Sequence, residues 1–118
     1  EKVDGVELSR TKLEPEQVLP VLDLVLDEMQ TAYREGYVHA DMSEYNVFVT
    51  SDGVVVFDWP QAVPTDHENA RELLARDVDN IVSYFARKYP QQISDVDDDA
   101  LADALADESF ESVREFLD

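Results

Sequence analysis

The stretch from Asn46 to Asp58, NVFVTSDGVVVFD, restricts the fold of this chain more than any other feature. Two runs of β-branched and aromatic residues flank Asp52-Gly53, and a tight Asp-Gly turn between such runs predicts an antiparallel hairpin. Both strands are short and consecutive, which excludes a parallel Rossmann sheet. Because the outer ends of a hairpin lie together, Asn46 before the first strand and Asp58 after the second are expected to meet.

Between Pro15 and Gly36 the sequence predicts a short turn followed by one main helix. Pro15 and Pro20 bracket the residues EQVL. Proline fits the first turn of a helix but interrupts its interior, so the helix is expected to start at about Pro20. Apolar residues then recur with helical spacing, and Gly36 stands where a helix ends. A short strand is predicted earlier, at GVEL from Gly5.

The second half of the chain predicts three further helices. Thr65 and Glu68 form the capping-box pattern at the start of a long helix that ends near Tyr89. The stretch SDVD, from Ser94, is expected to cap another helix, and SFESVREFL to form a last short one. The fold class predicted for these 118 residues is therefore α+β, a single mainly helical domain that carries a small antiparallel hairpin.

Charge is the dominant compositional signal. Acidic residues outnumber basic ones by 28 to 9, which gives a formal net charge of −19. Such a surface repels itself unless cations screen it, which favours a cytoplasmic protein of a high-salt organism over an ordinary acidic protein. Direct nucleic-acid binding is not expected, because affinity for phosphate backbones depends on Lys and Arg. No apolar run reaches the roughly 18 residues of a membrane helix, and the absence of cysteine excludes disulfides and thiolate metal sites.

The polar stretch HADMSEYN, residues 39–46, carries the chemistry. Asp41 lies five residues before Asn46, so both are expected near Asp58 at one end of the hairpin. Asp and Asn oxygens suit Mg²⁺, and a carboxylate off the metal can orient a hydroxyl or water and accept its proton. His39, Asp41, Asn46 and Asp58 match the order and spacing of the kinase catalytic and metal loops. The alternative is that these residues only cap turns and end a strand.

Asp77 falls on the apolar side of the long helix. A buried acid costs several kcal/mol unless it is paired or hydrogen-bonded. In a kinase-type site such an aspartate would accept backbone N–H bonds from the catalytic loop and hold its shape. The alternative is a boundary residue paired with Arg76 or with solvent.

The stretches GYVHADMSEYNVFV, FDWPQAV and HENARELLARDVDNIVSYF resemble the RIO family of atypical protein kinases, over about Gly5 to Tyr89. DWPQAV followed by ARDVDNI resembles its type-two branch, and the acidic composition suggests a haloarchaeal member. The resemblance implies a protein-kinase-like C-terminal lobe with a post-hinge segment at residues 1–14 and the lobe at 15–118. Its hairpin would carry a catalytic loop at 39–46 and a metal loop at 58–63.

The resemblance also implies an ATP-dependent enzyme of small-ribosomal-subunit maturation, acting as a serine/threonine kinase or as an ATPase. Asp41 would be the catalytic-loop acid, and Asn46 and Asp58 the Mg²⁺ ligands. Asp58 could also accept the γ-phosphoryl group as a transient aspartyl-phosphate. The partners implied are ATP and, through the longer protein, the pre-ribosomal small subunit.

Other positions would have supporting roles in that family. His39 is expected to hold the loop by packing and hydrogen bonding rather than to act as a base. Glu7 and Leu8 would border the adenine or ribose. Ser43 could contact phosphate, although a solvated turn serine is the plainer interpretation.

The chain also departs from the kinase pattern. It has no G-x-G-x-x-G loop, and Lys2 and Lys12 lie in the wrong context for the strand lysine that contacts nucleotide phosphates. The family's amino-terminal winged helix is missing as well. The sequence is therefore expected to be a C-terminal-lobe fragment that is inactive alone and that self-associates through exposed apolar surface.

Two rival functions remain open. A small-molecule phosphotransferase of the aminoglycoside or choline kinase type has a similar H-x-D, Asn and Asp-Trp arrangement, but such enzymes typically continue with Gly where this chain has Pro60. A non-catalytic module that docks on a ribosomal particle would explain the missing nucleotide elements.

Overall fold

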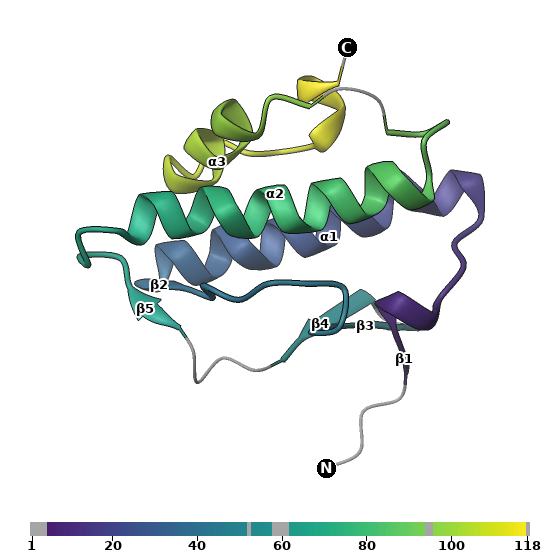
Figure 1. The fold of residues 1–118 in the computed structure, drawn as a ribbon, viewed down its shortest axis with the longest axis horizontal. Coiled ribbons are helices and arrows are strands. Elements are labelled where there is room, and N and C mark those ends of the chain that lie inside the picture. Colours follow the sequence, from purple (N-terminus) through teal and green to yellow (C-terminus); the bar gives the residue numbers. More distant parts are fainter. Residues whose placement is uncertain (1–4, 52, 58–61, 94–95, 118) are drawn as a thin grey trace.

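The structure is a computed structural model that describes residues 5–51, 53–57, 62–93 and 96–117. The helices lie together on one side of two small antiparallel sheets (Figure 1). The first sheet has three strands in the order β1-β3-β4, and the second pairs β2 with β5. The α+β class, mainly helical with a small hairpin, is confirmed. No helix in the described ranges is long and apolar enough to cross a membrane.

Helix α1 spans Pro15–Arg34, so the expectation of a separate turn before Pro20 is wrong. Glu14 and Gln17 form a capping box that starts the helix, with Pro15 in the first turn. Pro20 is tolerated inside the helix because its ring is exposed near the N-terminus while a buried apolar stripe continues past it. The predicted stop is confirmed, since Gly36 has φ +106° just after the helix.

The predicted hairpin is confirmed as β3, Val47–Thr50, and β4, Gly53–Val56. The predicted early strand is confirmed as β1, Gly5–Glu7. It pairs with β3 and extends the hairpin to three strands, and this pairing was not predicted from the sequence. Strand alternation turns one face toward α1 and the core, where the following valines lie: Val47, Val49, Val54 and Val56. The other face carries Glu7, Phe48 and Val55, which stand opposite one another in the register.

A second pair of strands was not predicted. β2, Tyr37–Val38, pairs with β5, Val63–Pro64, and the Thr65 amide donates to the Gly36 carbonyl at 2.9 Å. Thr65 is therefore part of a turn, and the predicted Thr65–Glu68 capping box is wrong. Helix α2 begins at Ala70 and ends at Lys88, close to the predicted end.

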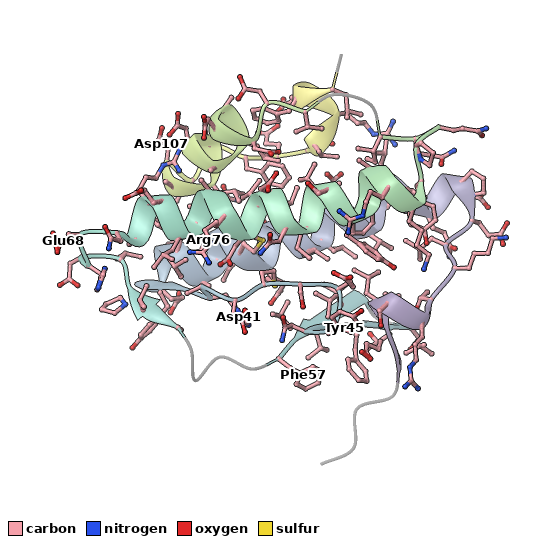
Figure 2. The ribbon with its side chains drawn as sticks, viewed as in Figure 1. Asp41, Tyr45, Phe57, Glu68, Arg76 and Asp107 are labelled. Carbon is pink, nitrogen blue, oxygen red and sulfur yellow. The ribbon has the colours of Figure 1, made fainter. Side chains whose placement is uncertain are left out.

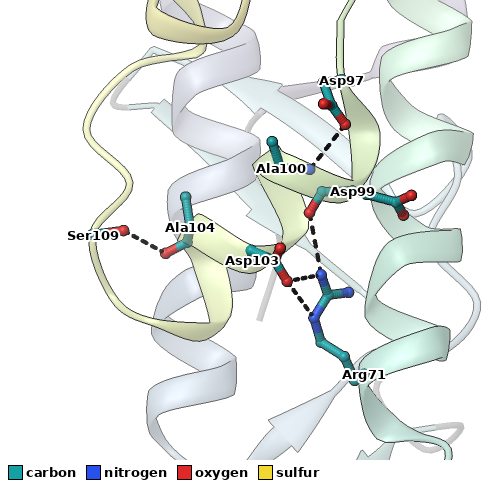
Figure 3. A network of polar contacts seen from close by, with 7 residues as sticks. All are labelled: Arg71, Asp97, Asp99, Ala100, Asp103, Ala104 and Ser109. Atoms are coloured by element: carbon teal, nitrogen blue, oxygen red, sulfur yellow. Dashed lines mark hydrogen bonds and ion pairs between the residues drawn. The ribbon is translucent and has the colours of Figure 1, made fainter.

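The remaining elements cover the outer side of α1 and α2 (Figure 1). Helix α3 spans Asp98–Ala106, and the Asp97 side chain caps it by accepting from the Ala100 amide at 3.0 Å (Figure 3). Ser94 and Asp95, which were also expected to cap this helix, lie outside the described residues. The last predicted helix is only a 3₁₀ turn, η3, at Val113–Phe116, and another 3₁₀ turn, η1, spans Leu8–Arg10.

Candidate active site

The loop from His39 to Asn46 joins β2 to β3 and lies on the sheet side of α2. In Figure 2, Asp41, Tyr45 and Phe57 lie on that side of the helix, whereas Asp107 lies on the opposite side with α3. The helix therefore separates the loop from the C-terminal part of the chain.

Asp77 fastens this loop to α2. Its side chain is 1% exposed, and its two oxygens accept from the Ala40 amide at 2.7 Å and the Met42 amide at 3.0 Å. Asn80, one turn further along, donates to the Met42 carbonyl at 3.2 Å. Burial raises the pKa of the Asp77 carboxyl, and the two N–H donors oppose that shift by stabilising the charged form.

The bonds to Asp77 hold the loop in an uncommon conformation. Ala40 has φ +72°, in the left-handed region that residues with a Cβ rarely adopt. A residue keeps such a conformation only where surrounding contacts hold its backbone in place, and such positions concentrate in functional sites. At Ala40 this contact is the hydrogen bond from its amide to the Asp77 carboxylate.

His39 connects the loop to the residue that follows β4, Phe57. The ring is 2% exposed, its Nδ1 accepts from the Asp41 amide at 3.2 Å, and its Nε2 lies 2.7 Å from the Phe57 carbonyl oxygen. An imidazole that accepts at Nδ1 carries its hydrogen on Nε2, so His39 donates to Phe57. Both ring nitrogens are therefore hydrogen-bonded to backbone groups, one in the loop and one directly after β4.

Asn46, just before β3, meets the chain where it leaves β4 at the same open end of the hairpin, as its position predicts. The Phe57 amide donates to the Asn46 carbonyl at 2.7 Å, and the Asn46 residue is 7% exposed. Ser43 Oγ donates to the Asn46 side-chain oxygen at 2.9 Å and accepts from the Tyr45 amide at 3.2 Å, so Ser43 shapes the turn.

Asp58, the next residue after Phe57, lies outside the described residues, as do Trp59, Pro60 and Gln61. Its neighbour Phe57 is hydrogen-bonded through both its amide and its carbonyl, to Asn46 and His39 respectively. Asp41 is exposed on the loop between them. Among the described residues, no group of three or more His, Asp or Glu side chains could hold a metal ion.

The segment after β1 borders the same loop. The Ser9 amide donates to the Glu44 carbonyl at 3.2 Å, and Glu7 lies beside Phe48 in the register of the sheet. Leu8 is fully buried, so its side chain packs in the core and only its backbone can face a ligand.

Sequence reasoning missed three residues around the loop: Phe48, Asn80 and Tyr84. Phe48 and Phe57 form a T-shaped pair with ring centroids 5.0 Å apart, and strand alternation from Asn46 would have placed Phe48 on the outward face. Asn80 lies three residues after Asp77, on the same side of the helix. Nothing in the sequence pattern singled out Tyr84, whose hydroxyl donates to the Leu8 carbonyl at 3.1 Å.

Comparison with known proteins gives consistent results. Residues 1–98 match the family model of the RIO domain. The chain is 40% identical over 93 residues to the RIO-type serine/threonine-protein kinase Rio2 of Methanocaldococcus jannaschii, covering 75% of this chain and 34% of the relative. It is 38% identical over 94 residues to the RIO-type serine/threonine-protein kinase Rio1 of Haloferax volcanii, covering 80% of this chain and 30% of the relative.

These two relatives are matched over about a third of their length. Among solved structures, the Rio2 kinase of Chaetomium thermophilum in an ADP/Mg²⁺-phosphoaspartate complex has a TM-score of 0.68 at 20% identity. The match covers 92% of this chain and 39% of that chain, which shows that the two share a fold and confirms the kinase-like fold class.

Proposed function

The chain belongs to the RIO domain family, and from that premise we propose that it forms the C-terminal lobe of an ATP- and Mg²⁺-dependent serine/threonine kinase or ATPase. Residues 1–14 are the post-hinge segment and 15–118 the lobe. The observation that carries the proposal is the pair of hydrogen bonds that the Asp77 carboxylate accepts from the Ala40 and Met42 amides. It fixes a polar loop against the hairpin end that Asn46 and Phe57 form.

Asp41 is the proposed catalytic acid of the loop at 39–46. Its exposed side chain stands on backbone that His39 and Asp77 hold on either side. Phosphoryl transfer depends chiefly on positioning and on electrostatic stabilisation, so a rigidly held carboxylate can orient the acceptor hydroxyl and take its proton.

Asn46 and Asp58 are the proposed Mg²⁺ ligands, Asp58 within a metal loop at 58–63. The structure supports the fit because the amide oxygen of Asn46 lies at the hairpin end, hydrogen-bonded to Ser43, and Phe57 brings the chain back to the same point. Amide and carboxylate oxygens suit Mg²⁺, which when bound would neutralise charge on the nucleotide phosphates. Asp58 is also proposed as a phosphoryl acceptor, which the phosphoaspartate complex of the Chaetomium thermophilum Rio2 kinase supports.

The outward face of the three-stranded sheet is the proposed nucleotide side. Phe48, Val55 and Phe57 make it apolar and Glu7 stands beside Phe48, whereas the described core residues pack on the opposite face. A purine could lie against this surface while its phosphates reach Asn46. Ser43 would then shape the phosphate end through Asn46, and the Leu8 backbone would border the base or ribose.

The wider role is proposed from the family resemblance. We place the longer protein in small-ribosomal-subunit maturation, with the type-two branch, a cytoplasmic location and a high-salt organism as parts of the same proposal. The 118 residues contain no Gly-rich loop, so alone they should bind nucleotide weakly, turn over little and self-associate. The net charge of −19 disfavours direct nucleic-acid contact by this lobe.

The proposal is tested by Mg·ATP titration and phosphoryl transfer with the full-length protein that carries this chain. Asp41→Asn and Asp58→Asn should each lower turnover by roughly 10²-fold or more, because each removes a charge needed in the transition state. Asp66→Asn, an exposed acid in the turn before α2, is the matched control and should change little.

A full-length protein that binds no Mg·ATP, and that is unaffected by Asp58→Asn, would support the non-catalytic docking module instead. Efficient transfer to an aminoglycoside or to choline, without protein phosphorylation or ATP hydrolysis, would support the small-molecule phosphotransferase.

A further inference from the structure

The C-terminal half of α2 holds the segment that follows β1. Tyr84 and Tyr89 are buried and Lys88 is exposed. Tyr84 Oη donates to the Leu8 carbonyl at 3.1 Å, and Tyr89 Oη accepts from the Leu13 amide at 2.9 Å. Both contacts fix backbone of the segment from Leu8 to Leu13.

Lys88 joins the two tyrosines. Its Nζ donates to the Thr11 carbonyl at 2.7 Å and to Tyr84 Oη at 2.9 Å, and it lies 5.4 and 5.9 Å from the ring centroids of Tyr84 and Tyr89. A cation over aromatic rings is attracted by their quadrupole. We name Tyr84, Lys88 and Tyr89 the tyrosine–lysine clamp.

The clamp and Asp77 lie on the same helix. Asp77 and Tyr84 are seven residues apart, which is about two turns or roughly 10 Å along the axis, and residues at that spacing share a face. One holds the loop at Ala40 and Met42, and the other holds Leu8. The bond from the Ser9 amide to the Glu44 carbonyl then joins the two held segments directly.

We propose that Tyr84 and Lys88 are positioning residues that set the distance between the nucleotide-bordering segment at Glu7–Leu8 and the catalytic loop. This inference rests on the proposed function and deepens it. Asp77 positions the loop that acts on the phosphates, and the clamp positions the backbone that borders the base or ribose. Loss of the clamp should therefore weaken ATP binding more than it slows the chemical step.

The test uses the full-length protein and the variants Tyr84→Phe and Lys88→Met, which remove a hydroxyl and a charge without emptying the core. Each should raise the KM for ATP about 3- to 10-fold, the usual effect of one lost hydrogen bond, and leave kcat within about 2-fold. Lys88→Arg, which keeps a donor and a charge, should restore most of the ATP affinity.

Two variants serve as matched controls. Tyr37→Phe removes a hydroxyl from a tyrosine that is 54% exposed on β2. Arg87→Met removes a positive charge from the exposed residue next to Lys88. Neither should change the KM for ATP.

Amide hydrogen exchange gives a readout that does not depend on activity. Tyr84→Phe should speed exchange of the Ser9 amide by about 3- to 10-fold and leave the Met42 amide, which Asp77 holds, unchanged. An unchanged Ser9 amide, or faster exchange with an unchanged KM for ATP, would overturn the positioning role while the proposed function stands. A wild-type protein without Mg·ATP-dependent turnover would overturn both, and the exchange result would still show whether the clamp holds the segment.

Discussion

A carboxyl group at least partly shielded from solvent lies on each side of α2, Asp77 on the helix itself and Asp98 at the start of α3, and the two groups are stabilised differently. On the sheet side, Asp77 is buried and accepts two backbone N–H bonds. On the α3 side, Asp98 is half-buried against Asp79, and its Oδ1 has no hydrogen-bond partner in the described part of the chain. Burial raises the pKa of both groups, and for Asp98 a hydrogen bond and the charge of Asp79 add to burial and raise its pKa to about 7.

The difference shows which surroundings allow a buried carboxyl group to hold neighbouring backbone in place. N–H donors stabilise the charged form, so Asp77 can order a loop, whereas a second carboxyl group stabilises only a protonated neighbour. The cleft of about 600 Å³ beside Asp98 is strongly acidic, and Arg76 is the one basic residue among the described residues that line it. The lining residues are Glu72, Ala75, Arg76, Asp79, Val96, Asp97, Asp98 and Asp99. Because these acids repel one another, we expect the stability of this side of the helix to depend on pH and salt.

The largest effect is expected at Asp77. Asp77→Ala leaves the Ala40 and Met42 amides without their acceptor and should lower the free energy of unfolding by about 2–5 kcal/mol. Urea unfolding monitored by circular dichroism measures it. Asp66→Ala, at an exposed acid, should change stability by less than about 0.5 kcal/mol. Equal effects of the two substitutions would show that the Asp77 bonds contribute nothing special to the loop.

On the opposite side, Asp98→Asn should stabilise the fold at high pH. The folded chain holds the Asp98 proton up to about pH 7, whereas an unfolded Asp releases its proton at about pH 4, so the unfolding free energy falls between these values as pH rises. Asparagine cannot ionise and can still donate to Asp79. At pH 8 the gain should be about 1 kcal/mol or less, because solvent screens this half-exposed group.

Urea unfolding of both proteins at pH 5 and pH 8, in low salt and in 2 M KCl, measures this difference. The gain should shrink toward pH 5 and in high salt. A difference that is the same at both pH values would show that Asp98 does not titrate in this range.

Ala40→Gly tests whether the loop stores strain. Glycine adopts φ +72° without the Cβ clash, but it also gives the unfolded chain more freedom, so the net gain should be about 0.5–1 kcal/mol. Thermal and urea unfolding measure the change, with Ala86→Gly inside α2 as a control that should be destabilising. A loss of stability at Ala40 would mean that the backbone there is relaxed.

Local patterns predicted the hairpin, the long helices and the place of Asp77 in an apolar stripe. They failed where distant segments decide the structure. Thr65 has a good capping pattern, but pairing of β5 with β2 holds it in a turn, and Pro20 remains in α1 because buried neighbours continue the helix. The contacts that build the site, such as Tyr84 with Leu8, join residues 76 apart in the chain, and no spacing rule links them.

The smallest effect is expected at the ion pair across α2 and α3. Arg71 binds Asp103 through Nε and Nη2 and also donates to the Asp99 carbonyl (Figure 3). The Arg71 side chain is 37% exposed and that of Asp103 is 66% exposed, so solvent screens the pair; Arg71→Met should cost only about 0.5 kcal/mol, and 1 M NaCl should remove most of that. A double-mutant cycle with Asp103→Ala isolates the pair. A coupling energy above about 2 kcal/mol that persists in salt would mean that the α3 side is held as firmly as the loop at Asp77.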